Sequence, residues 1–333
     1  MFETEQPEPV RWLPFERIRT IAVIGAGYMG GGIAQSLAAS GYEVVIADST
    51  PEAGRKALDR IIAETHQFET LGLLLGGSLA AVKTNLRAAN SLTEAVDGVD
   101  FVAEAVFEDL SVKGAVLSEI DSQARPDAII GSNTSTISVS DLASSVSRPE
   151  RFLTVHWSNP APFIPGVEVV VGSQTDLAVV PVVREMLAVA GKDSAVVADK
   201  PGFVLNRLQY ALLREACLIV EEGVTTIKDL DTIVRSTFGF RLPFFGPFAI
   251  ADMAGLDIYA SGFKTLEREF GSRFSPPKLI EAAVESGTTG LKSGNGLTGS
   301  FDAKRASGYV DYRSVAYATM AKVLQELGSP DRD

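Results

Sequence analysis

Short apolar runs alternate with amphipathic stretches up to about residue 200 of the chain. Runs rich in Val, Ile and Ala predict β-strands at 20–24, 42–48, 99–106, 128–135, 151–158, 167–172 and 193–199. The stretches between them repeat apolar residues at helical spacing and predict helices at 29–40, 51–74, 109–124 and 175–191. Residues 71–86 fit neither pattern clearly. The alternation predicts an α/β fold with a Rossmann-type doubly wound, mainly parallel sheet.

The pattern changes after the sequence DKPGF at 199–203, beyond which no strand is predicted. An apolar stripe that includes Val204, Leu208 and Leu212 predicts a long helix beginning near Phe203, and further helices are expected at 226–239 and from Ala249 onward. We therefore expect an α/β domain at 1–199, with 1–18 as a loose extension, and an all-helical domain at 200–333. Because this region has several apolar helices and little sheet for them to cover, we expect a homodimer formed mainly by these helices.

Composition narrows the choice of partners. The net charge of −12 disfavours nucleic acid and anionic membrane surfaces, because both require basic patches. The chain contains one cysteine, no apolar run of transmembrane length and no recognisable signal peptide, so a cytoplasmic location is expected. No metal site is predicted. An acidic substrate would need a local cation, since the overall field attracts no anion.

A glycine-rich stretch follows the first predicted strand. Gly25, Gly27 and Gly30 form G-x-G-x-x-G, with Tyr28 and Met29 between the last two glycines. A strand before this motif and a helix after it are the context of a dinucleotide-binding loop, in which the helix N-terminus receives a pyrophosphate. Asp48 ends the second strand, where a carboxylate would bind ribose hydroxyls and repel a 2′-phosphate. NAD is therefore the expected cofactor; the alternative is a glycine turn without a ligand.

Two polar residues interrupt the apolar strands at 151–158 and 167–172. Histidine as a residue type can exchange a proton near neutral pH, so His156 suits a proton acceptor, which a dehydrogenase needs to remove the hydroxyl proton of an alcohol. Glu168 stands within the run VEVVV, where an unpaired carboxylate would be costly. The turn NPAPFIP would return the second strand beside the first, so we expect a His–Glu pair. A satisfied core histidine is the alternative.

The chain resembles the L-3-hydroxyacyl-CoA dehydrogenase family over nearly its whole length, in the stretches GAGYMGGGIA, EAVFEDLSVK, SNTST, HWSNP followed by VEVV, PGFVLNR and KSGNGL. The resemblance implies that His156 is the general base and Glu168 its charge partner. It implies that Ser135 and Asn206 hydrogen-bond the substrate oxygen and orient the base.

The same resemblance assigns further residues to the cofactor: Asn159 near the nicotinamide, and Glu108, Lys113 and Asn133 in contact with NAD. The alternatives are structural. Ser135 would then only cap a turn, Asn159 would only shape the Asn-Pro turn, and Lys113 would be a solvated helix charge.

Two departures concern the substrate. Acyl-CoA members carry a lysine-rich helical pair after the second strand, whereas here the cations at 51–82 are only Arg55, Lys56 and Arg60. Arg241 stands in FGFRLPFFGPF, predicted to be a loop, and resembles the branch acting on small free acids, such as L-gulonate 3-dehydrogenase with lambda-crystallin, carnitine dehydrogenase and a pyridine-carboxylate dehydrogenase of vitamin B6 breakdown. A guanidinium suits a carboxylate because it donates two parallel hydrogen bonds.

Three functions remain open. The first is an NAD-dependent dehydrogenase that oxidises a small hydroxy acid, with Ser135, Asn206 and Arg241 binding the substrate. The second is an L-3-hydroxyacyl-CoA dehydrogenase. The third is a non-catalytic NAD-binding structural protein.

Overall fold

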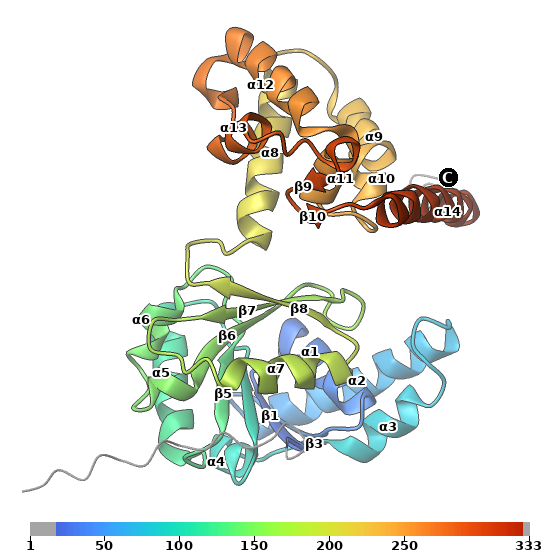
Figure 1. Ribbon diagram of the computed structural model, residues 1–333. Coiled ribbons are helices and arrows are strands. Elements are labelled where there is room, and N and C mark those ends of the chain that lie inside the picture. Colours follow the sequence, from blue (N-terminus) through green and yellow to red (C-terminus); the bar gives the residue numbers. More distant parts are fainter. Residues whose placement is uncertain (1–17, 329–333) are drawn as a thin grey trace, which may run out of the picture. The chain divides into compact units, whose positions relative to one another are not determined.

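The computed structural model describes residues 18–328, which divide into two compact units, one up to Leu213 and one from Arg214 onward (Figure 1). The division falls within helix α8 (Leu205–Glu221). Residues 1–17 of the predicted N-terminal extension lie outside the described residues. None of the helices within residues 18–328 combines the length and apolar composition needed to cross a membrane.

An eight-stranded sheet forms the centre of the N-terminal unit. Its spatial order is β3-β2-β1-β4-β5-β6-β7-β8, and only the β6–β7 pair is antiparallel. The strands are β1 (Thr20–Ile24), β2 (Glu43–Ala47), β3 (Leu86–Ala88), β4 (Phe101–Glu104), β5 (Ile129–Ser132), β6 (Phe152–Trp157), β7 (Gly166–Val171) and β8 (Asp193–Ala198). The predicted doubly wound fold is confirmed.

Helices cover both faces of this sheet (Figure 1). Successive strand residues point to opposite faces, so Ile21 and Val23 of β1 join one apolar cluster while Ala22 and Ile24 join the other. The first cluster packs against α1 (Tyr28–Ala39), α2 (Pro51–Thr70), α3 (Ser78–Asn85) and α7 (Val179–Val189). The second packs against α4 (Leu92–Val96), α5 (Leu110–Gln123) and α6 (Val139–Ala143).

The strand order reverses direction between β1 and β4. From β1 the sheet continues through β2 to β3 on one side, and from β4 through β5 to β6 on the other. In open α/β sheets, ligands bind outside the carboxyl ends of the strands at such a switch point. The segments that follow β1, β4, β5 and β6 are therefore the ones that build the site.

The structure resolves the stretch at 71–86, whose sequence fits neither a helix nor a strand clearly. Helix α2 ends at Thr70, and α3 and the short strand β3 follow. The sequence pattern missed β3 because only three residues pair with β2, too few to show an alternating pattern.

The C-terminal unit is mainly helical, as predicted. After α8 it contains α9 (Ile227–Ser236), α10 (Phe238–Arg241), α11 (Pro247–Ala254), α12 (Leu256–Phe270), α13 (Lys278–Glu285) and α14 (Ala303–Leu327), with short 3-10 turns η3 (Gly271–Phe274) and η4 (Leu291–Ser293). A small hairpin of β9 (Asn295–Gly296) and β10 (Gly299–Ser300) was not predicted. Buried Asp252 fixes its turn by accepting hydrogen bonds from the amides of Leu297 and Thr298, both at 2.8 Å.

Candidate active site

The glycine loop between β1 and α1 is shaped to receive a ligand. Gly25 has φ = 99°, and a Cβ there would lie 2.6 Å from the backbone of Ala105, so only glycine fits. A Cβ at Gly27 would instead meet no atom within 4 Å, which leaves open space beside the start of α1. Gly27 caps α1 without a side-chain hydrogen bond, whereas Asp109 caps α5 through its carboxylate. Exposed Tyr28 and the amides of the first turn are thus free to receive a pyrophosphate.

Two charged side chains brace this loop. The Oδ2 atom of Asp48 accepts a hydrogen bond from the amide of Ala26 at 2.7 Å. From α2, the Nη2 atom of Arg60 donates to the carbonyls of Ala26 and Gly27 at 3.1 and 3.2 Å. The half-buried Asp48 carboxylate therefore lies at the end of β2 next to the glycine loop, as its predicted contact with ribose requires. The ribose contact itself remains a prediction.

His156 and Glu168 face each other across the only antiparallel strand pair of the sheet. They are register partners on β6 and β7, and Nδ1 of His156 lies 2.8 Å from Oε2 of Glu168. Both side chains are buried. The other carboxylate oxygen, Oε1, accepts hydrogen bonds from the amides of Val204 and Leu205 at 2.9 and 3.0 Å. The backbone at the start of α8 thus fixes the carboxylate of Glu168, and this carboxylate in turn orients the imidazole of His156.

These contacts favour the ionised form of Glu168. Burial alone would raise the pKa of Glu168, but the hydrogen bonds from His156 and from the amides of Leu205 and Val204 outweigh it and keep the pKa below its usual range. An ionised Glu168 accepts the Nδ1–H of His156. In a neutral imidazole, Nε2 then carries a lone pair and is the atom that can take a proton.

Ser135 contacts this nitrogen, and Asn206 holds Ser135. The Oγ atom of Ser135 lies 3.1 Å from Nε2 of His156, and the Nδ2 atom of Asn206 donates to the backbone carbonyl of Ser135 at 3.1 Å. The structure therefore brings together all four predicted catalytic residues, from the segment after β5, from β6, from β7 and from α8. Ser135 is partly exposed, whereas His156 is buried.

Glu108 holds the segment that carries Ser135. Its Oε1 atom accepts hydrogen bonds from Thr134 Oγ1 (2.8 Å), from the amide of Ser135 (2.8 Å) and from Thr136. Burial would raise the pKa of Glu108, but these hydrogen bonds and the charge of Lys113 outweigh it, so the pKa lies below its usual range. Contact between Glu108 and the cofactor remains a prediction, alongside this observed structural role.

Lys113, also predicted to contact the cofactor, has no exposed surface. Its Nζ atom donates to Oε1 of Glu104 at 2.8 Å and lies 3.5 Å from Oε2 of Glu108. The Oε2 atom of Glu104 accepts from Ser132 Oγ at 2.5 Å. Lys113 thus lies between two carboxylates and is not a solvated helix charge, while its contact with the cofactor remains a prediction.

The remaining cofactor candidates lie along the same edge. Asn133 follows β5, and its Oδ1 atom accepts the amide hydrogen of Trp157 at 2.9 Å, which ties the end of β5 to the end of β6. Met29 is partly buried in the first turn of α1, where Gly30 packs closely against the carbonyl of Gly25. Asn159 is exposed at the start of the turn that follows His156.

Arg241 belongs to the C-terminal unit, where it ends the short helix α10. The predicted loop is therefore partly helical. Its neighbours in sequence pack on tyrosines of α14: the ring of Phe240 lies 5.5 Å from that of Tyr317, and the ring of Phe245 lies 5.6 Å from that of Tyr312. Arg241 is half-buried, and its guanidinium makes no ion pair with any residue in the range 18–328.

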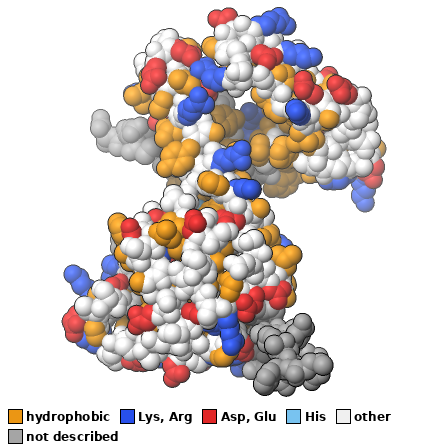
Figure 2. Space-filling view, turned by 90° about the vertical axis from the view of Figure 1, so that its left-hand side faces the viewer, with side chains coloured by type: hydrophobic (Ala, Val, Ile, Leu, Met, Phe, Trp, Pro, Cys, Tyr) orange, Lys and Arg blue, Asp and Glu red, His pale blue; other side chains and the backbone are white. Residues whose placement is uncertain are grey.

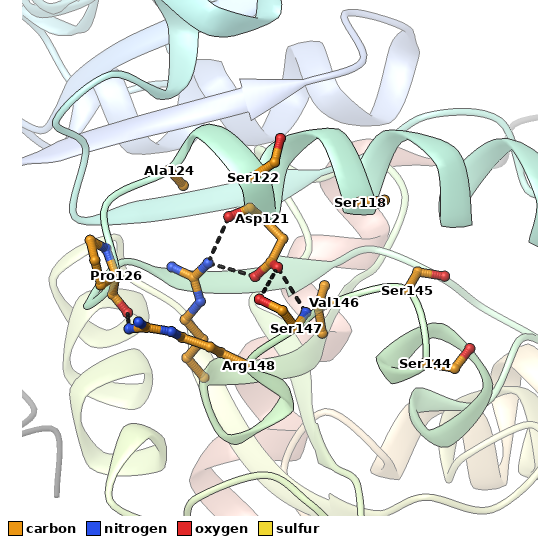
Figure 3. Close-up of a pocket in the computed structure, with 11 residues that line it drawn as sticks. Ser118, Asp121, Ser122, Ala124, Pro126, Ser144, Ser145, Val146, Ser147 and Arg148 are labelled. Carbon is orange, nitrogen blue, oxygen red and sulfur yellow. Dashed lines mark hydrogen bonds and ion pairs between the residues drawn. The ribbon is translucent and has the colours of Figure 1, made fainter. Parts of the chain in front are cut away.

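A hollow of about 620 Å³ lies elsewhere, near the amino ends of β5 and β6 (Figure 3). Its charged groups are already paired. Asp121 accepts hydrogen bonds from Arg151 at 2.6 Å and from the amide of Ser147 at 2.7 Å, while Arg148 donates to the carbonyl of Pro126 (Figure 3). These contacts fasten α5 to the segment before β6. Among residues 18–328, no group of three or more His, Cys, Asp or Glu side chains is arranged to hold a metal ion.

Sequence reasoning missed three side chains that shape the site: Arg60, Glu104 and Lys192. Glu104 could have been found by the argument applied to Glu168, because it too is a carboxylate inside an apolar strand. Arg60 has no sequence signal, since α2 meets the glycine loop only in the folded chain. Lys192 is considered below.

Comparison with known proteins agrees with this geometry. The NAD-binding domain of 3-hydroxyacyl-CoA dehydrogenase matches residues 20–200, and the C-terminal domain of 3-hydroxyacyl-CoA dehydrogenase matches residues 202–299. The chain belongs to the 3-hydroxyacyl-CoA dehydrogenase family. It is an NAD-dependent oxidoreductase that acts on a CH–OH group, so the non-catalytic alternative is disfavoured.

Three relatives show the range of the family. The chain is 39% identical over 281 residues to 5-formyl-3-hydroxy-2-methylpyridine 4-carboxylate 5-dehydrogenase of Mesorhizobium japonicum, covering 84% of this chain and 90% of the relative. A solved structure of a dehydrogenase with that activity, described as an NAD⁺-dependent dismutase, has a TM-score of 0.70 at 35% identity and covers 92% and 99% of the two chains. The 3-hydroxyacyl-CoA dehydrogenase of Archaeoglobus fulgidus has a TM-score of 0.76 at 33% identity and covers 93% and 99%.

Proposed function

We propose that this protein oxidises an alcohol of a small hydroxy acid, with His156 as the general base. The observation that carries the proposal is the His156–Glu168 pair, in which the Nε2 atom of His156 faces the hydroxyl of the partly exposed Ser135 at 3.1 Å. Bound NAD would accept the hydride from the alcohol carbon. Glycines 25, 27 and 30 with the start of α1 would hold its pyrophosphate, and Asp48 its ribose.

The chain's own groups manage the proton. The substrate hydroxyl would approach Nε2 of His156 and donate its proton there as the carbon–oxygen double bond forms. Ionised Glu168 would stabilise the resulting imidazolium, because it already accepts the Nδ1–H and is itself held by two amides of α8. Ser135, kept in place by Glu108 and Asn206, would hydrogen-bond the substrate oxygen.

Two features support a free acid, and not a CoA thioester, as the substrate. Arg241 is half-buried without an ion-pair partner among the described residues, so its guanidinium is available to bind a substrate carboxylate through two parallel hydrogen bonds. The pyridine carboxylate dehydrogenase, among the relatives above, takes its name from such an acid. The second candidate is a 3-hydroxyacyl-CoA substrate, which the likeness to the Archaeoglobus fulgidus enzyme favours.

The experiment that separates these candidates is a substrate panel. Small hydroxy acids, hydroxymethyl- and formylpyridine carboxylates, and 3-hydroxybutyryl-CoA would each be tested with NAD, following NADH absorbance. We expect turnover of a free acid at a kcat/KM at least about tenfold above that of the thioester. The opposite ranking would favour the acyl-CoA function.

We also propose that the protein is a homodimer assembled through its C-terminal helices. Hydrophobic side chains are exposed over the helices of this unit (Figure 2). On α8, Leu208 and Leu212 are 57% and 44% exposed, and this helix contains no buried residue. Exposed apolar surface on this scale is typical of an interface between copies.

A further inference from the structure

The turn between β6 and β7 cannot satisfy its own backbone. Residues 160–165 read PAPFIP, so this segment has six carbonyl groups but only three amide hydrogens, because proline has none. Two of these amides, from Phe163 and Ile164, both donate to the carbonyl of Pro160. Ala161 is buried within this turn, and a buried carbonyl needs a partner, so the turn requires a donor from outside.

Lys192, immediately before β8, supplies them. Its Nζ atom donates to the carbonyls of Ala161 at 2.6 Å, Ile164 at 3.0 Å and Pro162 at 3.4 Å. The amide of the next residue, Asp193, donates to the carbonyl of Pro165 at 2.9 Å. Four of the six carbonyls, those of Ala161, Pro162, Ile164 and Pro165, thus receive a hydrogen bond from Lys192 or its neighbour.

The environment of this ammonium group is unusual for a lysine. Lys192 is only 7% exposed and has no carboxylate partner among residues 18–328. Its charge is met by backbone carbonyls and by the ring of Trp157, whose centroid lies 5.5 Å from Nζ. Burying a lysine without a counter-ion is costly, and a turn that needed only to connect two strands would not require it.

The turn held in this way links the proposed base to the cofactor helix. It begins two residues after His156 and contains Asn159 at its start. Across from it lies Gly32 of α1, where a Cβ would meet Pro162 at 3.1 Å and Ala161 at 3.2 Å. Phe163 packs edge-on against Phe68 of α2, with ring centroids 5.0 Å apart. A displacement of the turn would therefore alter the distance between β6 and α1.

We infer that Lys192 is a positioning residue that sets His156 and Asn159 relative to the nucleotide-binding helix α1, by acting as the missing hydrogen-bond donor of the turn. The inference rests on the proposed role of His156 as the base. It goes further, because it assigns a part in hydride transfer to a side chain that touches neither the substrate oxygen nor the His–Glu pair.

Chemical rescue tests the inference directly. Lys192→Ala removes three methylenes and the ammonium group, which together equal propylammonium. We expect kcat to fall about 10- to 100-fold, the scale of a small misplacement of reacting groups, with NAD affinity reduced less than threefold. Propylammonium chloride should restore kcat several-fold. Trimethylpropylammonium chloride at equal concentration has the same charge but no N–H donor, and it should restore nothing.

A second variant reaches the same turn without touching Lys192. Gly32→Ala would push the turn away from α1, and we expect kcat to fall several-fold without rescue by propylammonium. Lys83→Ala, which removes an exposed lysine, is the control for the lost charge and should leave kcat unchanged. Thermal melting and NAD titration establish that each variant is folded.

Some results would overturn the inference. They are full kcat in Lys192→Ala or in Gly32→Ala, or equal restoration by the two ammonium salts. The proposed function fails separately: full turnover in His156→Gln would remove the base, whatever Lys192 variants show.

Discussion

The Nδ1 atom of His156 and the Oε2 atom of Glu168 lie 2.8 Å apart at directly opposed positions of β6 and β7. Antiparallel pairing sets side chains at opposed positions on the same face of the sheet. The pair therefore needs no loop to assemble it. Backbone hydrogen bonds of the two strands fix its geometry, and α8 contributes two amides that hold the far oxygen of the carboxylate.

Removal of the imidazole should stop turnover while cofactor binding persists. We expect His156→Gln to lower kcat by about 10²- to 10⁴-fold, the usual range for a positioned general base. NAD affinity, measured by fluorescence titration, should stay within a factor of a few. His66→Gln, at the chain's other and exposed histidine, is the matched control. Near-normal turnover in His156→Gln would contradict the mechanism.

Glu168 should make stability depend on acid pH. Its folded-state pKa lies below the ordinary value of 4.5, so the ionised carboxylate adds to the free energy of unfolding above that value. This contribution is lost as the pH falls through the lower, folded-state pKa. Urea unfolding from about pH 6 to about pH 3 should show a shallower decline for Glu168→Gln than for the wild type. An exposed carboxylate, in Glu119→Gln, should not flatten the curve; identical slopes in all three proteins would contradict the assignment.

Asp48 should determine the choice of dinucleotide. A carboxylate at the end of β2 repels the 2′-phosphate of NADP, so kcat/KM should be higher with NAD. Asp48→Ala should narrow the ratio of the two kcat/KM values, with Asp59→Ala, an exposed position on α2, as the control. Equal turnover of the wild type with NAD and NADP would disprove this role.

Arg241 should govern affinity for an acidic substrate. Loss of one charge-assisted bidentate contact costs about 1.5–3 kcal/mol, so Arg241→Met should raise KM for the free acid by about 10- to 150-fold. NAD affinity should not change. Arg235→Met removes an exposed arginine of α9 in the same unit and should leave KM unaltered. Efficient oxidation of 3-hydroxybutyryl-CoA by both wild type and Arg241→Met would support the acyl-CoA function instead.

The proposed homodimer should depend on the apolar surface of α8. We expect wild-type protein to scatter with twice the chain mass at micromolar concentration, and a combined Leu208→Glu and Leu212→Glu substitution to shift the mass toward one chain. Leu75→Glu, at an 86% exposed leucine of the N-terminal unit, should not. A concentration-independent monomer mass for the wild type would refute the dimer.

The sequence predicted the sheet and the His–Glu pair because both have local signals. Short continuous apolar runs define the long strands, and a carboxylate at position 168 within VEVVV is conspicuous without a partner. The sequence could not predict the roles of residues that depend on contacts between distant parts of the chain. Arg60 meets the glycine loop 33 residues away in sequence. The contact of Lys113 with Glu104 was not predicted either, because the packing of α5 brings the two side chains together.

Helix α14 begins just beyond residue 299, where the match to the C-terminal domain of the family ends. Its Tyr309, Tyr312 and Tyr317 contact the phenylalanines that flank Arg241. A shortened chain ending near Phe301 would keep the three glycines of the glycine loop and the His–Glu pair. It would leave those phenylalanines without their aromatic partners. Truncation where the family match ends is thus expected to leave the proton acceptor and the cofactor loop in place and to weaken discrimination among substrates. Helix α14 would then influence substrate selectivity without taking part in the reaction.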